Sequence, residues 1–241
     1  MDKPRHLIGT AGWIAPRTLP EFGGEGSGLE RYAKVFRALE INTSFYRRHR
    51  PATWQRWHDA VADDFSFSVK LPRTITHEKG LAGAEEEIGF FFEDVAPLGR
   101  KLGAVLVQLP PKLGFDGAVA EAFLRSLRER SCVSIFIEPR HASWAEGTAS
   151  ALLRQFDVGR VLADPQGEPL RAAAEAGPSC YLRLHGSPRI YYSSYDDAAL
   201  ARYADYLSAA AGPCWCIFDN TASGAAVENA LRFKALLDQR A

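Results

Sequence analysis

The chain has 241 residues, 46% hydrophobic and 24% charged, which suffices for one large core, and α/β barrels of this length are often a single domain. Its 29 basic and 29 acidic residues give zero net charge, which disfavours nucleic acid as a partner, because proteins that bind it usually carry a basic excess. No stretch is long and apolar enough to span a bilayer, and the first nine residues lack the apolar region of a signal peptide. We therefore expect no membrane partner and a cytoplasmic location.

Short apolar segments that end in polar residues recur along the chain. They are rich in β-branched and aromatic residues, and glycine, proline or polar clusters bound them, as is typical of strands. We predict eight strands, at residues 7–9, 38–42, 65–71, 104–109, 133–137, 159–164, 179–185 and 215–220.

Between most of these strands, apolar residues recur at helical spacing. We predict helices at residues 29–37, 51–62, 86–98, 119–130, 144–156, 196–211 and 225–237, and residues 165–177 form the weakest unit. Alternating strands and helices call for a parallel sheet, since the helices serve as crossovers. Eight such units favour a closed (β/α)8 TIM-type barrel, one domain over residues 1–241, over an open doubly wound sheet, whose GxGxxG motif is missing.

The fifth predicted strand ends abruptly in a carboxylate. Residues 133–137 are mostly β-formers, and Pro139 stops the strand just after Glu138 because proline has no N–H for the sheet ladder. A carboxylate at the end of a buried strand is costly to desolvate, so it needs a partner or a chemical function. Glu138 is therefore the best single candidate for a general acid or base, or for a group that holds Arg140 or Lys70.

The active site of such a barrel lies at the C-terminal ends of its strands. Every predicted strand places at least one polar or aromatic residue there, which a purely structural chain does not require, although single members can also be helix caps or loop ion pairs. The ring consists of Thr10, Trp13, Glu40, Asn42, Lys70, His77, Gln108, Glu138, Arg140, Asp164, Arg183, His185, Asp219 and Asn220.

Two pairs of ring residues lie two positions apart, so each pair points to one side of its strand. Glu40 and Asn42 are the first pair, and Glu40 either takes part in catalysis or forms a buried ion pair with Lys70 or Arg183. Arg183 and His185 are the second pair, which suits an anion or a proton transfer.

The ends of the last two strands resemble an anion site. Residues 220–224 open directly into a helix, whose free N–H groups and positive end attract phosphate or carboxylate; the alternative is that Ser223 only caps that helix. No motif requires a metal or another cofactor, and a divalent metal stays open. The four cysteines, Cys132, Cys180, Cys214 and Cys216, lack the spacing of a disulfide framework and favour reduced thiols.

Short motifs occur at nearly every strand end. They are GTAGW at 9–13, EINTSFY at 40–46, FSVK at 67–70, TH at 76–77, QLP at 108–110, EPRH at 138–141, SW at 143–144, RLHG at 183–186, FDN at 218–220 and NA at 229–230. Together they resemble the domain-of-unknown-function 72 family, also called YecE-like, over nearly the whole chain.

The resemblance implies a TIM-type barrel, but it implies no reaction. The pocket positions that it implies are Trp13, Glu40, Asn42, Tyr46, Lys70, His77, Gln108, Glu138, Arg140, Trp144, Arg183, His185 and Asn220. Ala11 stands where the family more often has serine, and Asp219 where it often has asparagine. The segment after Trp13 is glycine-rich rather than aromatic, so we expect a different pocket rim.

The favoured function is an enzyme that performs acid/base chemistry on a small anionic, phosphate-bearing substrate. The catalytic residues are then Glu138 as acid or base, Glu40 or His185 as its partner, and Lys70, which holds the anion together with Arg140 and Arg183.

Two other functions and a non-catalytic ligand sensor remain as alternatives. A nucleic-acid binding or phosphodiester-processing protein would turn the same cations toward a nucleic-acid backbone. A glycosidase would use Glu40 and Glu138, and it requires two carboxyl groups about 5–9.5 Å apart with neither tied up in a salt bridge.

Overall fold

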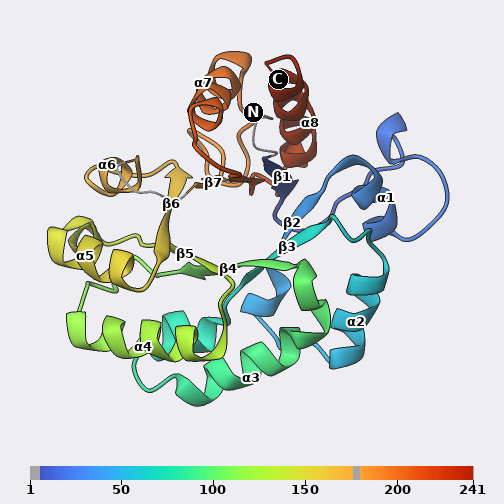
Figure 1. The fold of residues 1–241 in the computed structure, drawn as a ribbon. Helices are drawn as coiled ribbons and strands as arrows, with labels where there is room; N and C mark the ends of the chain where they lie inside the picture. The colour runs from blue at the N-terminus through green and yellow to red at the C-terminus, as the bar shows by residue number, and fades with distance from the viewer. Residues whose placement is uncertain (1–5, 176–179, 241) are drawn as a thin grey trace.

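The computed structural model describes residues 6–175 and 180–240, which form one α/β barrel. Eight parallel strands lie in the order β1-β8-β7-β6-β5-β4-β3-β2, with the helices around them (Figure 1). The barrel prediction is confirmed, and each predicted strand is found; Ser179 of the seventh lies outside the described residues. The strands are β1 (Leu7–Thr10), β2 (Ala38–Ile41), β3 (Ser66–Lys70), β4 (Leu102–Gln108), β5 (Ser134–Glu138), β6 (Val158–Asp164), β7 (Tyr181–Leu184) and β8 (Trp215–Phe218).

The helices follow the strands that they connect. They are α1 (Gly28–Val35), α2 (Pro51–Asp59), α3 (Glu85–Val95), α4 (Gly117–Arg130), α5 (Gly147–Gln155), α6 (Leu170–Glu175), α7 (Asp197–Ser208) and α8 (Ala225–Asp238). None of these described helices is both long and apolar enough to cross a membrane.

Three predicted units differ in detail. The helix predicted at 86–98 ends at Val95, because Pro97 has no N–H to continue the α-helical bonding. The helix predicted at 144–156 begins at Gly147, since Glu146 is extended and separates it from a short 3-10 turn. The weakest predicted unit contains α6, and its residues 176 and 177 lie outside the described residues.

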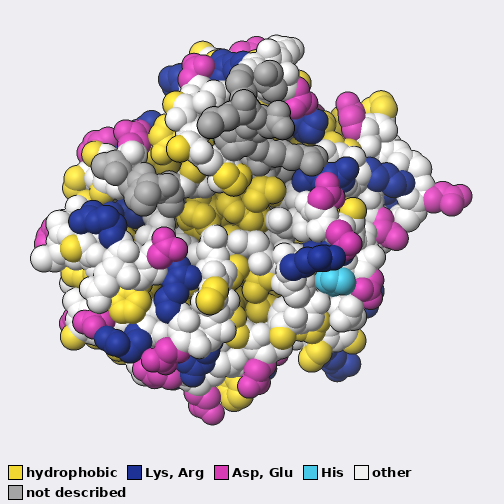
Figure 2. All heavy atoms as spheres, in the orientation of Figure 1, with side chains coloured by type: hydrophobic (Ala, Val, Ile, Leu, Met, Phe, Trp, Pro, Cys, Tyr) yellow, Lys and Arg dark blue, Asp and Glu magenta, His cyan; other side chains and the backbone are white. Residues whose placement is uncertain are grey.

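The strands bury apolar side chains on both sides, outward against the helices and inward in a smaller cluster that includes Phe136 and Trp215, and the buried charged side chains also point inward. In β7, Leu182 and Leu184 belong to the large core under the helices, whereas Tyr181 and Arg183 point into the barrel. Such two-residue alternation is the pleat of a strand. Figure 2 shows apolar side chains around the middle of one face, with cationic and anionic ones interspersed at its edge.

The barrel closes between β1 and β2, where the described residues form no regular ladder. One bridge pairs Ala11 with Glu40, and the Gly12 N–H donates to the Glu40 carbonyl over 2.8 Å. At Gly9 the strands approach so closely that any Cβ would clash with the Ala38 carbonyl oxygen. A glycine is therefore required at this seam.

The buried phenol of Tyr32 replaces part of the missing ladder. Its hydroxyl accepts a hydrogen bond from the Thr10 N–H over 2.8 Å and donates one to the Ala38 carbonyl over 3.1 Å. We expect Tyr32→Phe to lower the free energy of unfolding by about 1–3 kcal/mol, because two buried backbone groups lose their partner. Urea denaturation measures the change, with Tyr46→Phe as the exposed control; equal effects in both variants would contradict the role.

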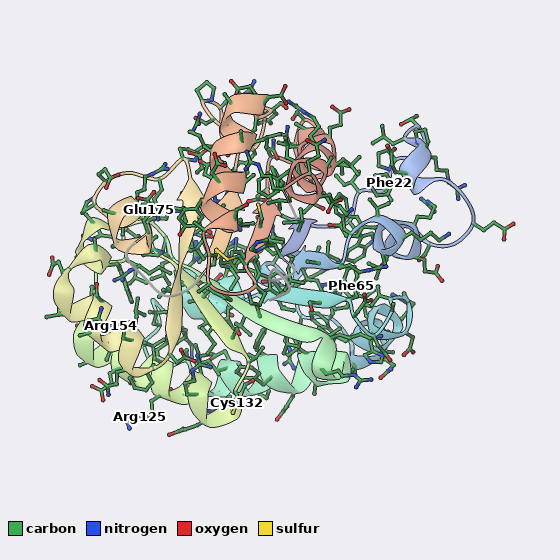
Figure 3. The ribbon with its side chains drawn as sticks, turned by 45° about the horizontal axis from the view of Figure 1, so that its top comes forward. Phe22, Phe65, Arg125, Cys132, Arg154 and Glu175 are labelled. Carbon is green, nitrogen blue, oxygen red and sulfur yellow. A yellow bond between two sulfur atoms is a disulfide. The ribbon has the colours of Figure 1, made fainter. Side chains whose placement is uncertain are left out.

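A disulfide joins Cys180 and Cys214 at the N-terminal ends of β7 and β8 (Figure 3). The expectation of reduced thiols is therefore wrong for these two residues, whereas Cys132 and Cys216 are free. Tyr181 lies opposite Trp215 in the parallel register, so the residues before them face one another, with Cα atoms 4.7 Å apart. A cytoplasmic location stays a prediction, and this bond does not favour it, because cytosolic thiols are normally kept reduced.

Candidate active site

Charged side chains converge inside the barrel at the C-terminal ends of the strands. The carboxylates of Glu40, Glu138 and Asp219 meet the side chains of Arg183 and His185 there, and none of the five residues is more than 6% exposed. They come from β2, β5 and β7 and from the residues directly after β7 and β8. We call these five residues the charged cluster.

Arg183 is the centre of the charged cluster. Its Nε and Nη2 donate to the two oxygens of Glu40 over 3.0 and 2.8 Å. Its Nη1 donates to Glu138 Oε2 over 3.1 Å, and Nη2 also lies 2.9 Å from Asp219 Oδ2. The planar fork of one guanidinium therefore serves three carboxylates, which suits arginine and not lysine.

Glu40 is a fully buried carboxylate of the charged cluster. Besides its bonds to Arg183, its Oε2 accepts a hydrogen bond from the Tyr181 hydroxyl over 2.8 Å, and that hydroxyl lies 2.9 Å from Ser68 Oγ. All four residues are buried. Of the two roles considered for Glu40, the structure contains the buried ion pair with Arg183.

His185 connects the charged cluster to the rim. Its Nδ1 lies 2.9 Å from Asp219 Oδ2, and its Nε2 lies 3.1 Å from Glu138 Oε1 and 2.8 Å from Arg140 Nη2. In a neutral ring Nε2 accepts from Arg140 and Nδ1 donates to Asp219, because a guanidinium nitrogen always carries hydrogen. A protonated ring would instead donate to Glu138, so proton uptake and the Arg140 contact exclude one another.

The charges of the cluster shift the pKa values of its members. Burial alone would raise the pKa of Glu138, but Arg183 and the neighbouring cations hold it well below its ordinary value. Burial also acts to raise the pKa of Asp219, and Arg183 and His185 lower it. Burial lowers the pKa of His185, but Glu138 and Asp219 raise it above the usual value. Both carboxylates are thus ionised at neutral pH.

Lys70 is the cation of the mouth that lacks a carboxylate partner. No hydrogen bond or ion pair of its ammonium group occurs among the described residues, and its Nζ lies 4.1 Å from the centre of the Phe45 ring. The residue is 8% exposed. Burial, with a smaller effect of Arg183, lowers its pKa from 10.5 to about 8, although the carboxylates of the charged cluster act to raise it. A lysine of this kind exchanges its proton close to neutral pH.

Three further predicted residues lie beside that lysine or the charged cluster. His77 packs edge-to-face on Phe45, with ring centres 4.9 Å apart, and burial lowers its pKa. Asn42 directly follows β2 and is half-buried, and its Oδ1 finds no partner among the described residues. Gln108 is the register partner of Glu138 and donates through Nε2 to the next carbonyl over 2.8 Å.

Three predicted pocket residues lie outside this group. Trp13 packs against Trp57 of α2, with ring centres 5.2 Å apart. Trp144 is 1% exposed and donates through Nε1 to the Leu113 carbonyl over 3.0 Å. Tyr46 is 73% exposed. The first two therefore have packing contacts in place of contacts with the charged cluster.

The segment after β8, where an anion site was expected, has many of its polar groups already bonded. Asn220 is buried and donates through Nδ2 to Asn229 Oδ1 over 2.8 Å and to the Ser193 carbonyl over 2.9 Å. The Ser223 hydroxyl donates to the Tyr192 carbonyl over 2.6 Å. These contacts tie the loops after β7 and β8 to α8.

Some contacts of the site were missed from the sequence. Asp219 was placed in the polar ring but was not chosen as a site residue, and Ser68 and Tyr181 were not considered. The two-residue alternation of a strand would have indicated two of them. Tyr181 lies on the same side of β7 as Arg183 and His185, and Asp219 continues the inward-facing side of β8. The Phe45–Lys70 contact left no comparable signal, because it joins a loop to a strand.

The groups that remain for a ligand are cationic. The carboxylates of the charged cluster are already paired with arginine or histidine. Within residues 6–175 and 180–240, no three His, Cys, Asp or Glu side chains are grouped so as to hold a metal ion. Arg140 is partly exposed and contacts Glu138, and Lys70 has no bonded carboxylate. A buried ammonium group without such a partner can hold an anion.

Comparison with known proteins identifies the relatives of this barrel. A family model described as "Protein of unknown function DUF72" matches residues 7–241. The chain belongs to the DUF72 family. This confirms the family resemblance that the strand-end motifs indicated.

Two curated relatives of this DUF72 chain carry the family name UPF0759. YecE of Escherichia coli strain K12 is 31% identical over 166 residues, which cover 63% of this chain and 60% of YecE. YunF of Bacillus subtilis strain 168 is 25% identical over 267 residues, which cover 96% of this chain and 94% of YunF. The chain thus spans 60% of the length of YecE and nearly all of YunF.

Solved DUF72 structures share the fold. A DUF72 protein from Enterococcus faecalis V583 superposes with a TM-score of 0.80 at 23% identity, covering 96% of this chain and 95% of that one. A second, from Thermotoga maritima MSB8, gives 0.78 at 24% identity, covering 97% and 99%. At such identities the likeness shows the barrel and carries no argument about chemistry.

Proposed function

We propose that the protein is an enzyme that performs acid/base chemistry on a small, anionic, phosphate-bearing molecule at the C-terminal mouth of the barrel. The observation that carries the proposal is Lys70, a buried ammonium group without a carboxylate partner among the described residues. Leaving such a group unpaired costs stability, which a binding site recovers when an anion arrives.

The proposed roles follow from the protonation of each group. Lys70, with a pKa of about 8, holds the anion as ammonium and accepts a proton as amine. Glu138 stays ionised, so it orients Arg140 and Arg183 more readily than it donates a proton. His185 takes up a proton when an anion draws Arg140 away from its Nε2.

The two alternatives find less support. A nucleic-acid binder needs a contiguous basic face, whereas surface cations such as Arg37 and Arg48 pair with carboxylates, and charges of both signs mix on the face in Figure 2. A glycosidase needs both carboxyl groups available, whereas Arg183 holds Glu40 and Glu138 together.

Phosphate titration tests the proposal. We expect inorganic phosphate to bind wild-type protein and to shift the NMR signals of the mouth, and Lys70→Met to weaken this binding at least tenfold, because the replacement keeps the shape but not the charge. Lys234→Met, at an exposed ion pair with Asp238, should bind phosphate like the wild type.

A panel of phosphorylated metabolites, followed by phosphorus NMR, then tests turnover. The expected result is at least one substrate that wild-type protein converts and Lys70→Met does not. Full activity of Lys70→Met on an identified substrate, or phosphate binding that ignores this substitution, would overturn the assignment.

A further inference from the structure

We propose that a groove beside the mouth binds a planar ring, so that the substrate is a phosphate that carries an aromatic or heteroaromatic group. The inference rests on the proposed function and specifies its substrate class. The groove lies between the loop after β2, the start of the segment after β3, and one side of α3. Its volume is about 290 Å³, just below the ~300–1,000 Å³ of small-molecule sites. That size admits one small ring system and no macromolecule.

Aromatic side chains line the groove, and two of them are open to solvent. Tyr46 is 73% exposed and meets Phe45 edge-to-face with ring centres 4.9 Å apart, and Phe90 of α3 is 38% exposed. Large apolar side chains left in water next to a concavity mark a binding surface more than a packing one. Stacking on such rings tolerates many ligands, provided that they are planar.

A fixed guanidinium adds a second stacking surface. Arg48 donates through Nε and Nη2 to both oxygens of Asp94 over 2.6 and 2.8 Å, and its Cζ lies 4.8 Å from the centre of the Phe90 ring. Asp94 thereby holds a flexible side chain in one place before any ligand arrives. A guanidinium held this way stacks on flat rings.

The charge of the groove fits a ring that belongs to an anion. Three arginines line it, against the carboxylates Glu87 and Asp94. Asp94 is bonded to Arg48, and Glu87 pairs with Lys79 over 2.6 Å. Arg73 pairs with Glu78 over 3.1 Å, which leaves Arg47 as the lining arginine without a carboxylate partner among the described residues, so a cationic ring is disfavoured.

Phe45 connects the groove to the phosphate position. The same side chain lines the groove and lies 4.1 Å from Lys70 Nζ at its ring centre. The Ser44 hydroxyl, also at the groove, donates to the Lys70 carbonyl over 2.7 Å. Only the side chain of Phe45 thus separates a ring that lies against Tyr46 from the Lys70 ammonium group that would hold its phosphate.

Calorimetric titration with inorganic phosphate and phenyl phosphate tests the inference. We expect wild-type protein to bind phenyl phosphate about tenfold more tightly than phosphate. Tyr46→Ala and Phe90→Ala should abolish this gain and leave the affinity for phosphate unchanged. Ile14→Ala, at an exposed apolar residue outside the groove, should preserve the gain. Circular dichroism of each variant confirms that it is folded.

The outcomes separate the two proposals. If wild-type protein gains nothing from the ring, or if the gain survives both groove variants, the ring site is wrong while phosphate binding that depends on Lys70 still stands. If neither probe binds, or if both bind Lys70→Met as they bind the wild type, the proposed function itself fails.

Discussion

Replacing Arg183 with methionine is expected to lower the free energy of unfolding by about 3–5 kcal/mol, the usual effect of breaking a buried ion pair by removing one partner. Arg183 contacts Glu40, Glu138 and Asp219, and none of these residues is more than 6% exposed. Without the guanidinium, the carboxylates repel one another in a site that water barely reaches. They must then take up protons or open the barrel to solvent.

Chemical denaturation at several pH values checks this result and its sign. Glu138 and Asp219 have lowered pKa values in the folded chain, so their stabilisation is present above the unfolded values of about 4 and is lost as the pH falls through the folded ones. In Arg183→Met burial is no longer offset by Arg183 and raises these pKa values, so this variant should instead gain stability as the pH falls from neutral toward about 4, and its deficit against the wild type should shrink.

Two further variants serve as controls for Arg183→Met. Arg232→Met removes an arginine from an exposed pair with Asp197 and should change stability by at most about 0.5 kcal/mol. Adding Glu40→Gln to Arg183→Met should recover part of the loss, since one unpaired charge disappears. A cost below about 1 kcal/mol for Arg183→Met, or no recovery in the double variant, would contradict a charged cluster organised by this residue.

The barrel was predictable because the local sequence around every strand carries the pattern of a strand followed by a turn or a helix. Segments such as residues 104–109 are short, β-branched and ended by proline, and a helical pattern follows. The closing seam was not predictable in the same way. Gly9 and Tyr32 both contact the backbone of Ala38, which belongs to another strand. The residues next to Gly9 or Tyr32 in the sequence do not indicate that contact. The Cys180–Cys214 pair likewise depends on the register of β7 against β8.

The candidate site was predictable where a strand carries the residue and less so where a loop does. Arg183 and His185 lie two apart, and both reach Glu138 as the pleat requires. Trp144 and Asn220 also stand near strand ends, but their side chains bond within the loops and helices around the barrel. The position of a residue at a strand end predicts that it lies near the mouth. Whether the side chain of a loop residue points into the mouth depends on tertiary packing, which the local sequence does not show.

Lys70 is the residue at which stability and the proposed function oppose one another. It has no hydrogen-bonding or ion-pairing partner among the described residues, and its pKa falls from 10.5 to about 8 on folding. At ~1.4 kcal/mol per pKa unit, keeping the charge in the folded chain at pH 7 costs about 3 kcal/mol relative to the unfolded chain. Sites that break the rules of stability in this way are expected at functional positions.

We therefore expect Lys70→Met to raise the free energy of unfolding at pH 7 by about 3 kcal/mol while it removes phosphate binding. The sign follows from proton binding. Between pH 8 and 10.5 the unfolded chain keeps the proton on Lys70 and the folded chain has lost it, so wild-type stability gains with rising pH.

Urea denaturation from pH 6 to 10.5 measures the difference between the two proteins. That difference should be largest at and below neutral pH and should shrink as the pH rises past about 8. Lys234→Met removes an exposed lysine paired with Asp238 and should run parallel to the wild type throughout. Two results would contradict this prediction: a Lys70→Met protein less stable than wild type at pH 7, or a stability difference that does not change with pH. Either result would mean that the folded chain already stabilises the ammonium group without a bound anion.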